Sequence, residues 1–136
     1  MAGLVLDATV ALALVMPDER KPQTSTIETM RRDGAVVPGL WWLEVANTLL
    51  MASRRRRIGD EFRKLALRDL ATLPVSSDAE TDMRAWNETL ALAERYDLTV
   101  YDAAYLELAH RRGLPLASFD GDLRKVARKA KIPLLD

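Results

Sequence analysis

The chain alternates short, wholly apolar runs with longer segments of mixed polarity. Short apolar runs are typical of buried parallel strands, because a strand covered on both faces has no solvent-facing side. Helical segments separate these runs, so the strands are predicted to form one parallel sheet. We expect strands at residues 3–6, 35–37, 74–75, 115–118 and 132–135.

The intervening segments predict helices whose ends carry recognisable residues. Pro17 stops the first helix, and Gly34 and Gly113 follow two later ones, as glycine often does at helix C-termini. Asp60 and Glu61 suit the positive N-terminal end of another helix. The expected helices span residues 8–16, 21–33, 40–57, 60–72, 78–96, 102–112 and 121–129.

One expected helix, residues 78–96, shows clear helical periodicity. Apolar residues recur in it at spacings of three and four, so we expect one apolar stripe along a continuous helix. That stripe consists of Met83, Trp86, Leu90 and Ala93. No repeat or linker interrupts the pattern, which predicts a single α/β domain over residues 1–136.

Composition removes several classes of function. Lysine plus arginine equals aspartate plus glutamate at 20 each, so only a local patch could attract a polyanion. The absence of cysteine excludes disulfides, thiolate nucleophiles and zinc–sulfur sites. The N-terminus is a poor signal peptide, and no apolar run is long enough to span a bilayer. We therefore expect a cytoplasmic protein without membrane contact.

Four acidic residues are notable for their positions. Asp7 and Asp120 follow expected strands, at the edge where parallel sheets bind ligands, although each could simply cap the next helix. Glu44 and Asp102 interrupt apolar stretches, where unpaired carboxylates are rare. The alternatives are a solvent-facing or arginine-paired Glu44 and an Asp102 that is only an N-cap. Together, the four carboxylates could converge on one pocket.

Converging carboxylates would repel one another and raise one another's pKa unless a cation neutralised them. Oxygen ligands favour Mg²⁺ or Mn²⁺. The single histidine, His110, is expected at the surface, so a zinc hydrolase or a serine triad is poorly supported. The chemistry that suits such a site is phosphodiester hydrolysis by metal-activated water.

Four segments resemble, in order and spacing, the signature segments of PIN domains, specifically the VapC toxins of bacterial toxin–antitoxin pairs. They are LVLDAT at 4–9, WLEVAN at 42–47, LTVYDAAY at 98–105 and LASFD at 116–120. The resemblance runs from about residue 3 to residue 135. It implies a PIN-like α/β/α sandwich with a central four- to five-stranded parallel sheet. It also implies an endoribonuclease dependent on Mg²⁺ or Mn²⁺, with transfer RNA as a plausible substrate.

The resemblance assigns roles to particular residues. Acids matching Asp7, Glu44, Asp102 and Asp120 would hold the metal and carry catalysis. Supporting candidates are Thr9, Ser118, Asp122 and, on the helical face of Glu44, Asn47. The family more often has serine where this chain has Thr9 and threonine where it has Ser118, and both positions keep a hydroxyl. Asp122 could equally be a plain surface residue, and Asp97 stands where relatives often have glycine.

The resemblance also implies a homodimer and a cognate VapB-type antitoxin that lies along a hydrophobic groove. Trp41 and Trp42 are candidates for that groove or the dimer contact, and core packing is the alternative for at least one of them. The only dense basic run is Arg54-Arg55-Arg56-Arg57. It is a candidate for binding the RNA backbone, and favourable interaction with the helix dipole is the alternative.

Three other protein classes also use acidic residues of this kind or resemble this fold, and the sequence fits each of them less well. A haloacid-dehalogenase-like phosphatase needs a second aspartate two residues after its nucleophile, where this chain has Thr9. A receiver domain needs adjacent acids after its first strand and a late lysine, and neither is clear here. A non-catalytic PIN-like binding module would usually have lost some of the four acids.

Overall fold

A parallel sheet forms the centre of the computed structural model, which describes residues 2–136. Its four strands lie in the order β3-β2-β1-β4, and each pairing is parallel. The α/β prediction with a four- to five-stranded parallel sheet is confirmed. The expected strand at 132–135 is reduced to a single bridge between Leu134 and Leu116. The strands are β1 (Leu4–Leu6), β2 (Ala35–Val37), β3 (Val75–Ser77) and β4 (Leu116–Ala117).

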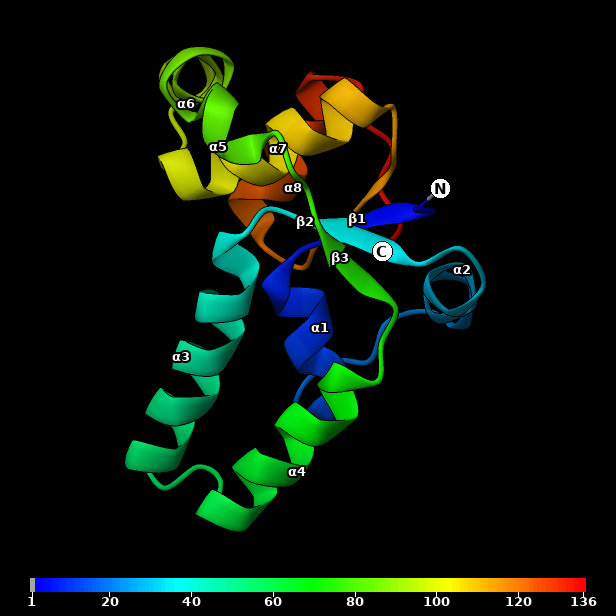
Figure 1. The fold of residues 1–136 in the computed structure, drawn as a ribbon, viewed down its shortest axis with the longest axis vertical. Helices are drawn as coiled ribbons and strands as arrows, with labels where there is room; N and C mark the ends of the chain where they lie inside the picture. Colours follow the sequence, from blue (N-terminus) through cyan, green and yellow to red (C-terminus); the bar gives the residue numbers. More distant parts are fainter. Residues whose placement is uncertain (1) are drawn as a thin grey trace.

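Helices lie on both sides of this sheet (Figure 1). On one side are α7 (Val100–Arg112) and α8 (Gly121–Lys129), and on the other is α1 (Ala8–Val15). The long helices α3 (Leu40–Arg54) and α4 (Asp60–Ala71) project away from the sheet as a hairpin, and α2 (Thr24–Asp33) lies beside it. Within residues 2–136, no helix has both the length and the apolar character needed to cross a membrane.

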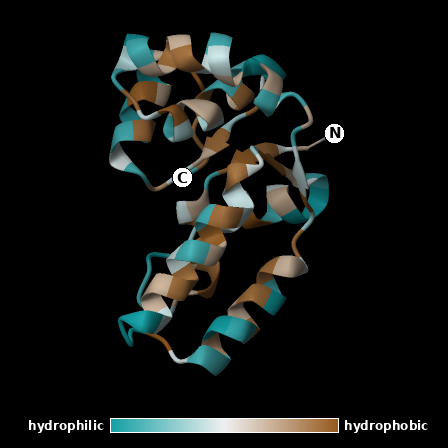
Figure 2. Ribbon diagram, turned by 60° about the vertical axis from the view of Figure 1, so that its left-hand side comes forward, coloured by the Kyte–Doolittle hydropathy of each residue, from teal (hydrophilic) through white to brown (hydrophobic). Residues whose placement is uncertain are grey.

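The core is one continuous cluster centred on the two inner strands. Every side chain of β1 and β2 is buried, which matches their uninterrupted apolar sequences. Figure 2 shows these strands as hydrophobic, with hydrophilic residues spread over the outer helices. The edge strand β3 is more polar and more exposed. Because the two inner strands are buried, the end of β1 that precedes Asp7 is held in a fixed position.

Two helix ends differ from their predicted positions. The helix α2 begins at Thr24 rather than Lys21, because the Lys21 ammonium donates hydrogen bonds at 2.8 Å to carbonyls at the end of α1. Just before α2, the Asp136 carboxylate accepts a hydrogen bond from the Gln23 amide at 3.0 Å. The helix α3 ends at Arg54, close to the turn where Arg56 has a φ of 59°.

The helix predicted over 78–96 is present as an unbroken helical segment from Thr81 to Tyr96, but it contains a π-helical turn. The segment forms α5 (Thr81–Arg84), a π-helical turn η1 (Ala85–Thr89) and α6 (Leu90–Tyr96). A π turn carries more residues than an α turn and so shifts the helical register. Most of the expected apolar stripe is exposed: Trp86 is 88% accessible and Met83 73%, while Ala93 alone is buried.

A buried group of charges joins the end of β3 to α7. The Asp78 carboxylate, whose side chain is inaccessible to solvent, accepts hydrogen bonds from Arg111 and Arg112. Thr81 donates to the same carboxylate at 2.7 Å, and Glu107 pairs with Arg111 at 2.8 Å. Burial would raise the pKa of Asp78, but these hydrogen bonds outweigh it and hold that pKa well below its usual range.

Candidate active site

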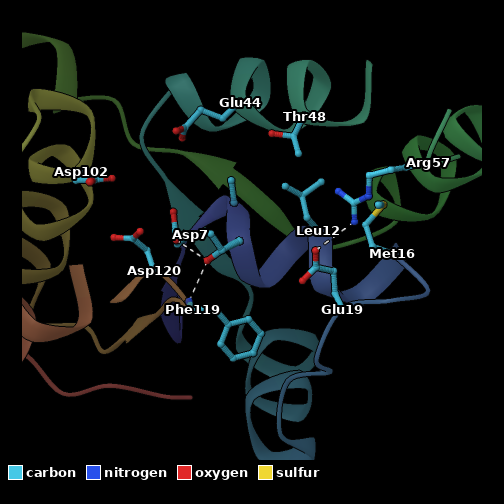
Figure 3. A pocket seen from close by; sticks show the side chains of 12 residues that line it. Asp7, Leu12, Met16, Glu19, Glu44, Thr48, Arg57, Asp102, Phe119 and Asp120 are labelled. Carbon is cyan, nitrogen blue, oxygen red and sulfur yellow. Dashed lines mark hydrogen bonds and ion pairs between the residues drawn. The ribbon is translucent and has the colours of Figure 1, made fainter. Parts of the chain in front are cut away.

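A cavity of about 420 Å³ opens where β1 and β4 end (Figure 3). This is the edge at which parallel α/β sheets commonly bind ligands. All four acids predicted from the sequence line it, although they come from four separate segments of the chain. The lining residues are Asp7, Ala8, Thr9, Leu12, Met16, Glu19, Glu44, Thr48, Arg57, Asp102, Phe119 and Asp120.

Asp7 is buried directly after β1, and its carboxylate makes no hydrogen bond that caps α1. Its Oδ2 atom instead accepts from the Thr9 hydroxyl at 2.6 Å and from the Ser118 hydroxyl at 2.7 Å. Burial raises the pKa of Asp7, the two hydroxyls oppose that rise, and the nearby Asp120 carboxylate adds to it. The geometry therefore excludes simple helix capping for Asp7.

The two hydroxyls also connect the ends of β1 and β4. Ser118 accepts from the Asp120 amide at 3.1 Å, and Thr9 accepts from the Phe119 amide at 2.9 Å. Asp120 does cap α8, because its Oδ2 atom accepts from the Leu123 amide at 2.9 Å. Its capping role and its place in the cavity are thus compatible.

Glu44 faces the cavity from α3 without an arginine partner. Its Oε1 atom accepts a 2.5 Å hydrogen bond from the buried Tyr105 hydroxyl. Burial raises the pKa of Glu44, the tyrosine opposes that rise, and the carboxylates of Asp7 and Asp102 add to it. Tyr105 was not predicted as a site residue, although its position three residues after Asp102 places both on one helical face.

Asp102 lies in the first turn of α7 and is not its N-cap. Thr99 caps this helix, and its hydroxyl accepts from the Asp102 amide at 3.1 Å. Burial raises the pKa of Asp102 to about 6, and the carboxylates of Asp120, Asp7 and Asp122 contribute to the rise. Asp122 is exposed and outside the cavity lining, yet its charge acts on Asp102.

The chemistry of these donors fits a hard divalent cation, because all are carboxylate oxygens and three of them have raised pKa values. These carboxylates lie farther apart than the ligands of an occupied metal site. Among residues 2–136, no three acidic, histidine or cysteine side chains are gathered closely enough to hold one ion. The side chains would have to draw together around a bound cation.

The remaining predicted site residues are distributed unevenly. Asn47 is exposed and outside the cavity lining, whereas Thr48, one turn after Glu44, faces the cavity. Of the four adjacent arginines, only Arg57 lines the cavity. His110 is exposed, as predicted.

The two adjacent tryptophans have different environments. Trp41 is 2% accessible and belongs to the core, whereas Trp42 is 45% accessible. The Trp42 indole donates to the Ser77 hydroxyl at 2.7 Å. The core alternative therefore holds for Trp41, and Trp42 keeps a surface that a partner could contact.

Three comparisons relate the chain to known proteins. Residues 4–129 match the family model described as "PIN domain". The chain is 33% identical over 124 residues to Ribonuclease VapC3 of Pyrobaculum aerophilum, covering 88% of this chain and 91% of that protein. The crystal structure of PAE2754 from the same organism superposes with a TM-score of 0.66 at 23% identity, covering 90% of this chain and 77% of that one. That structural likeness supports the fold.

Proposed function

Since the chain belongs to the PIN-domain family and is a VapC-type member, we propose that it is a metal-dependent endoribonuclease and the toxin of a VapBC-type pair. One observation carries the proposal. Four carboxylates from distant segments line a single cavity, and three of them have raised pKa values. A cluster of this kind costs free energy in a protein unless a cation offsets its charge. Metal binding would account for the free-energy cost of this carboxylate cluster.

We assign Asp7, Glu44, Asp102 and Asp120 as ligands of Mg²⁺ or Mn²⁺. Such an ion, when bound, lowers the pKa of a coordinated water and offsets charge on phosphate oxygens. The supporting hydrogen bonds come from the chain itself. Thr9 and Ser118 orient the Asp7 carboxylate, and Tyr105 orients Glu44. These bonds keep carboxylate oxygens turned toward the cavity, where the scissile phosphodiester would bind.

The proposed substrate is RNA, with transfer RNA as the first class to test. A cognate VapB-type antitoxin and a second copy of the chain are the proposed protein partners, and the proposed compartment is the cytoplasm. Hydrolysis by water predicts products with 5′-phosphate and 3′-hydroxyl ends. Those ends distinguish this reaction from attack by the ribose 2′-hydroxyl, which needs no metal-bound water.

The direct test is cleavage of an RNA panel that includes transfer RNA, with Mg²⁺, Mn²⁺ or EDTA. We expect cleavage with the metals, none with EDTA, and a loss of at least about 100-fold in Asp7→Asn and Asp102→Asn, because each substitution removes one charged ligand. Asp69→Asn, an exposed aspartate on α4, is the control and should cleave normally. Circular dichroism checks that each variant is folded. Undiminished cleavage by Asp7→Asn and Asp102→Asn would refute the assignment of these ligands. No cleavage by the unsubstituted protein with either metal would instead favour a non-catalytic PIN-like module.

A further inference from the structure

One basic side chain lines a cavity whose other charged lining residues are all acidic. Arg57 is the only basic residue among the described residues that line the candidate active site. Figure 3 shows it beside Glu19, at the end of the cavity away from Asp102 and Asp120. The cavity thus has an acidic end and a distinct second end that bears a guanidinium group.

The backbone around Arg57 is well anchored. The Arg57 amide donates to the Ala52 carbonyl at 2.9 Å, and the next side chain, Ile58, is buried in the core. The positive φ of Arg56 turns the chain at this point. All four arginines of the run are exposed, but Arg57 alone lines the cavity.

The guanidinium group of Arg57 keeps much of its binding capacity. Its Nη2 atom lies 2.8 Å from the Asp18 carboxylate and 3.7 Å from that of Glu19. Within the described residues, Nε and Nη1 donate no hydrogen bond, and the side chain is 45% accessible. Arginine has five N–H donors in a planar fork, a geometry that matches phosphate. The unused donors can therefore bind an anion in the cavity.

A polyanion entering this cavity meets unfavourable charge at the acidic end. A metal ion would offset that charge locally, but a neighbouring phosphate of the same strand would still need a positive partner. Arg57 is the only lining residue within the described chain that can provide one. Because the net charge of the chain is zero, the protein as a whole does not attract RNA electrostatically. Attraction must come from local contacts such as this one.

We propose that Arg57 binds a backbone phosphate of the RNA, adjacent to the phosphodiester that lies at Asp7, Glu44, Asp102 and Asp120. This inference rests on the proposed ribonuclease function and deepens it, because it identifies which member of the four-arginine run contacts substrate. Asp18 and Glu19 compete with the phosphate for the guanidinium group, so RNA binding partly replaces an internal ion pair.

The test compares Arg57→Ala with Arg55→Ala, which removes the same charge from the same run outside the cavity. Binding of a fluorescein-labelled single-stranded RNA of mixed sequence is measured by anisotropy in EDTA, from about 50 to 200 mM salt. We expect Arg57→Ala to weaken binding roughly fivefold and to reduce the salt slope by about 0.7, as loss of one phosphate contact does on single strands. Arg55→Ala should stay within about twofold of the unsubstituted protein.

A third variant distinguishes a phosphate contact made by Arg57 from a structural role of its ion pair with Asp18. Asp18→Asn breaks the same ion pair but leaves the arginine, so it should tighten RNA binding. Equal weakening by Arg57→Ala and Arg55→Ala, weakening by Asp18→Asn, or no RNA binding by the unsubstituted protein would overturn the contact. The matching kinetic result is a raised KM with little change in kcat for Arg57→Ala.

Failure of the contact and failure of the proposed function give different results. A protein that binds RNA through Arg57 but cuts none of the panel with Mg²⁺ or Mn²⁺ refutes the nuclease alone. A protein that cuts RNA while Arg57→Ala binds like the unsubstituted chain refutes the contact alone.

Discussion

At the residue scale, the ionised Asp102 carboxylate destabilises the metal-free protein at neutral pH. Its pKa of about 6 lies above the ordinary value of 3.8, so the folded state holds its proton more tightly than the unfolded state does. Stability contributed by this group is therefore full at acid pH and is lost as the pH rises through about 6. At pH 7.5 the carboxylate remains charged beside Asp120 and Asp7.

We accordingly expect Asp102→Asn to raise the free energy of unfolding in EDTA at pH 7.5, by on the order of 1 kcal/mol after allowance for solvent screening. Urea unfolding at pH 7.5 and pH 4.5 measures the effect. The gain should shrink at pH 4.5, where the native carboxyl group is protonated. Mn²⁺ should stabilise the unsubstituted protein more than the variant. A variant that is less stable at pH 7.5 would contradict the pKa assignment.

At the element scale, the Asp78 cluster attaches the end of β3 to α7, the helix that carries Asp102. Removing one partner from a buried ion pair leaves the other charges without compensation. Asp78→Asn should therefore lower the free energy of unfolding at pH 7 by about 3 kcal/mol, measured by urea denaturation. The exposed Asp69→Asn substitution should change it by less than about 0.5 kcal/mol.

The same cluster predicts acid sensitivity with a definite sign. Because the pKa of Asp78 is depressed, its contribution to stability is complete above the unfolded value of 3.8 and is lost as the pH falls below it. The gap in stability between the unsubstituted protein and Asp78→Asn should hence narrow below about pH 4. A gap that stays constant into acid would show that the substitution acts through packing instead.

Sequence predicted the inner strands well, because the runs at Leu4–Leu6 and Ala35–Val37 have only one plausible environment. The sequence pattern could not predict helix ends that depend on residues distant in the chain. The start of α2 is set by Lys21 bonding back to α1 and by a carboxylate from Asp136, more than a hundred residues away in the chain. Periodicity also could not show that Met83 and Trp86 face solvent, because it reports a shared face but not what covers it.

For the site, spacing and apolar context were enough to select the four carboxylates. Spacing and apolar context were not enough to identify the other residues that line the cavity beside these carboxylates. Asn47 and Thr48 differ by one residue, or about 100° around α3, and only the packed helix shows that Thr48 faces the cavity. Arg57 likewise could not be distinguished within its run until the turn after α3 was known.

At the scale of the whole molecule, Met83 and Trp86 form an exposed apolar projection on α5 and η1. Large exposed apolar side chains commonly mark contact surfaces. If the proposed homodimer uses this surface, Trp86→Glu should convert dimers to monomers in light scattering after size exclusion. Leu65→Glu, an equally polar change at an exposed leucine of α4, should leave them paired. Dimers that survive Trp86→Glu would place the contact elsewhere.

The unequal settings of the three tryptophans provide an optical reporter that needs no label. Trp41 lies in the core, whereas Trp86 is almost fully in water, so acrylamide should quench emission from the second far more than from the first. Covering η1 with another chain would remove much of that quenching and shift the emission to shorter wavelength. Fluorescence of the unmodified protein, followed during dilution, would then report dissociation of the proposed homodimer.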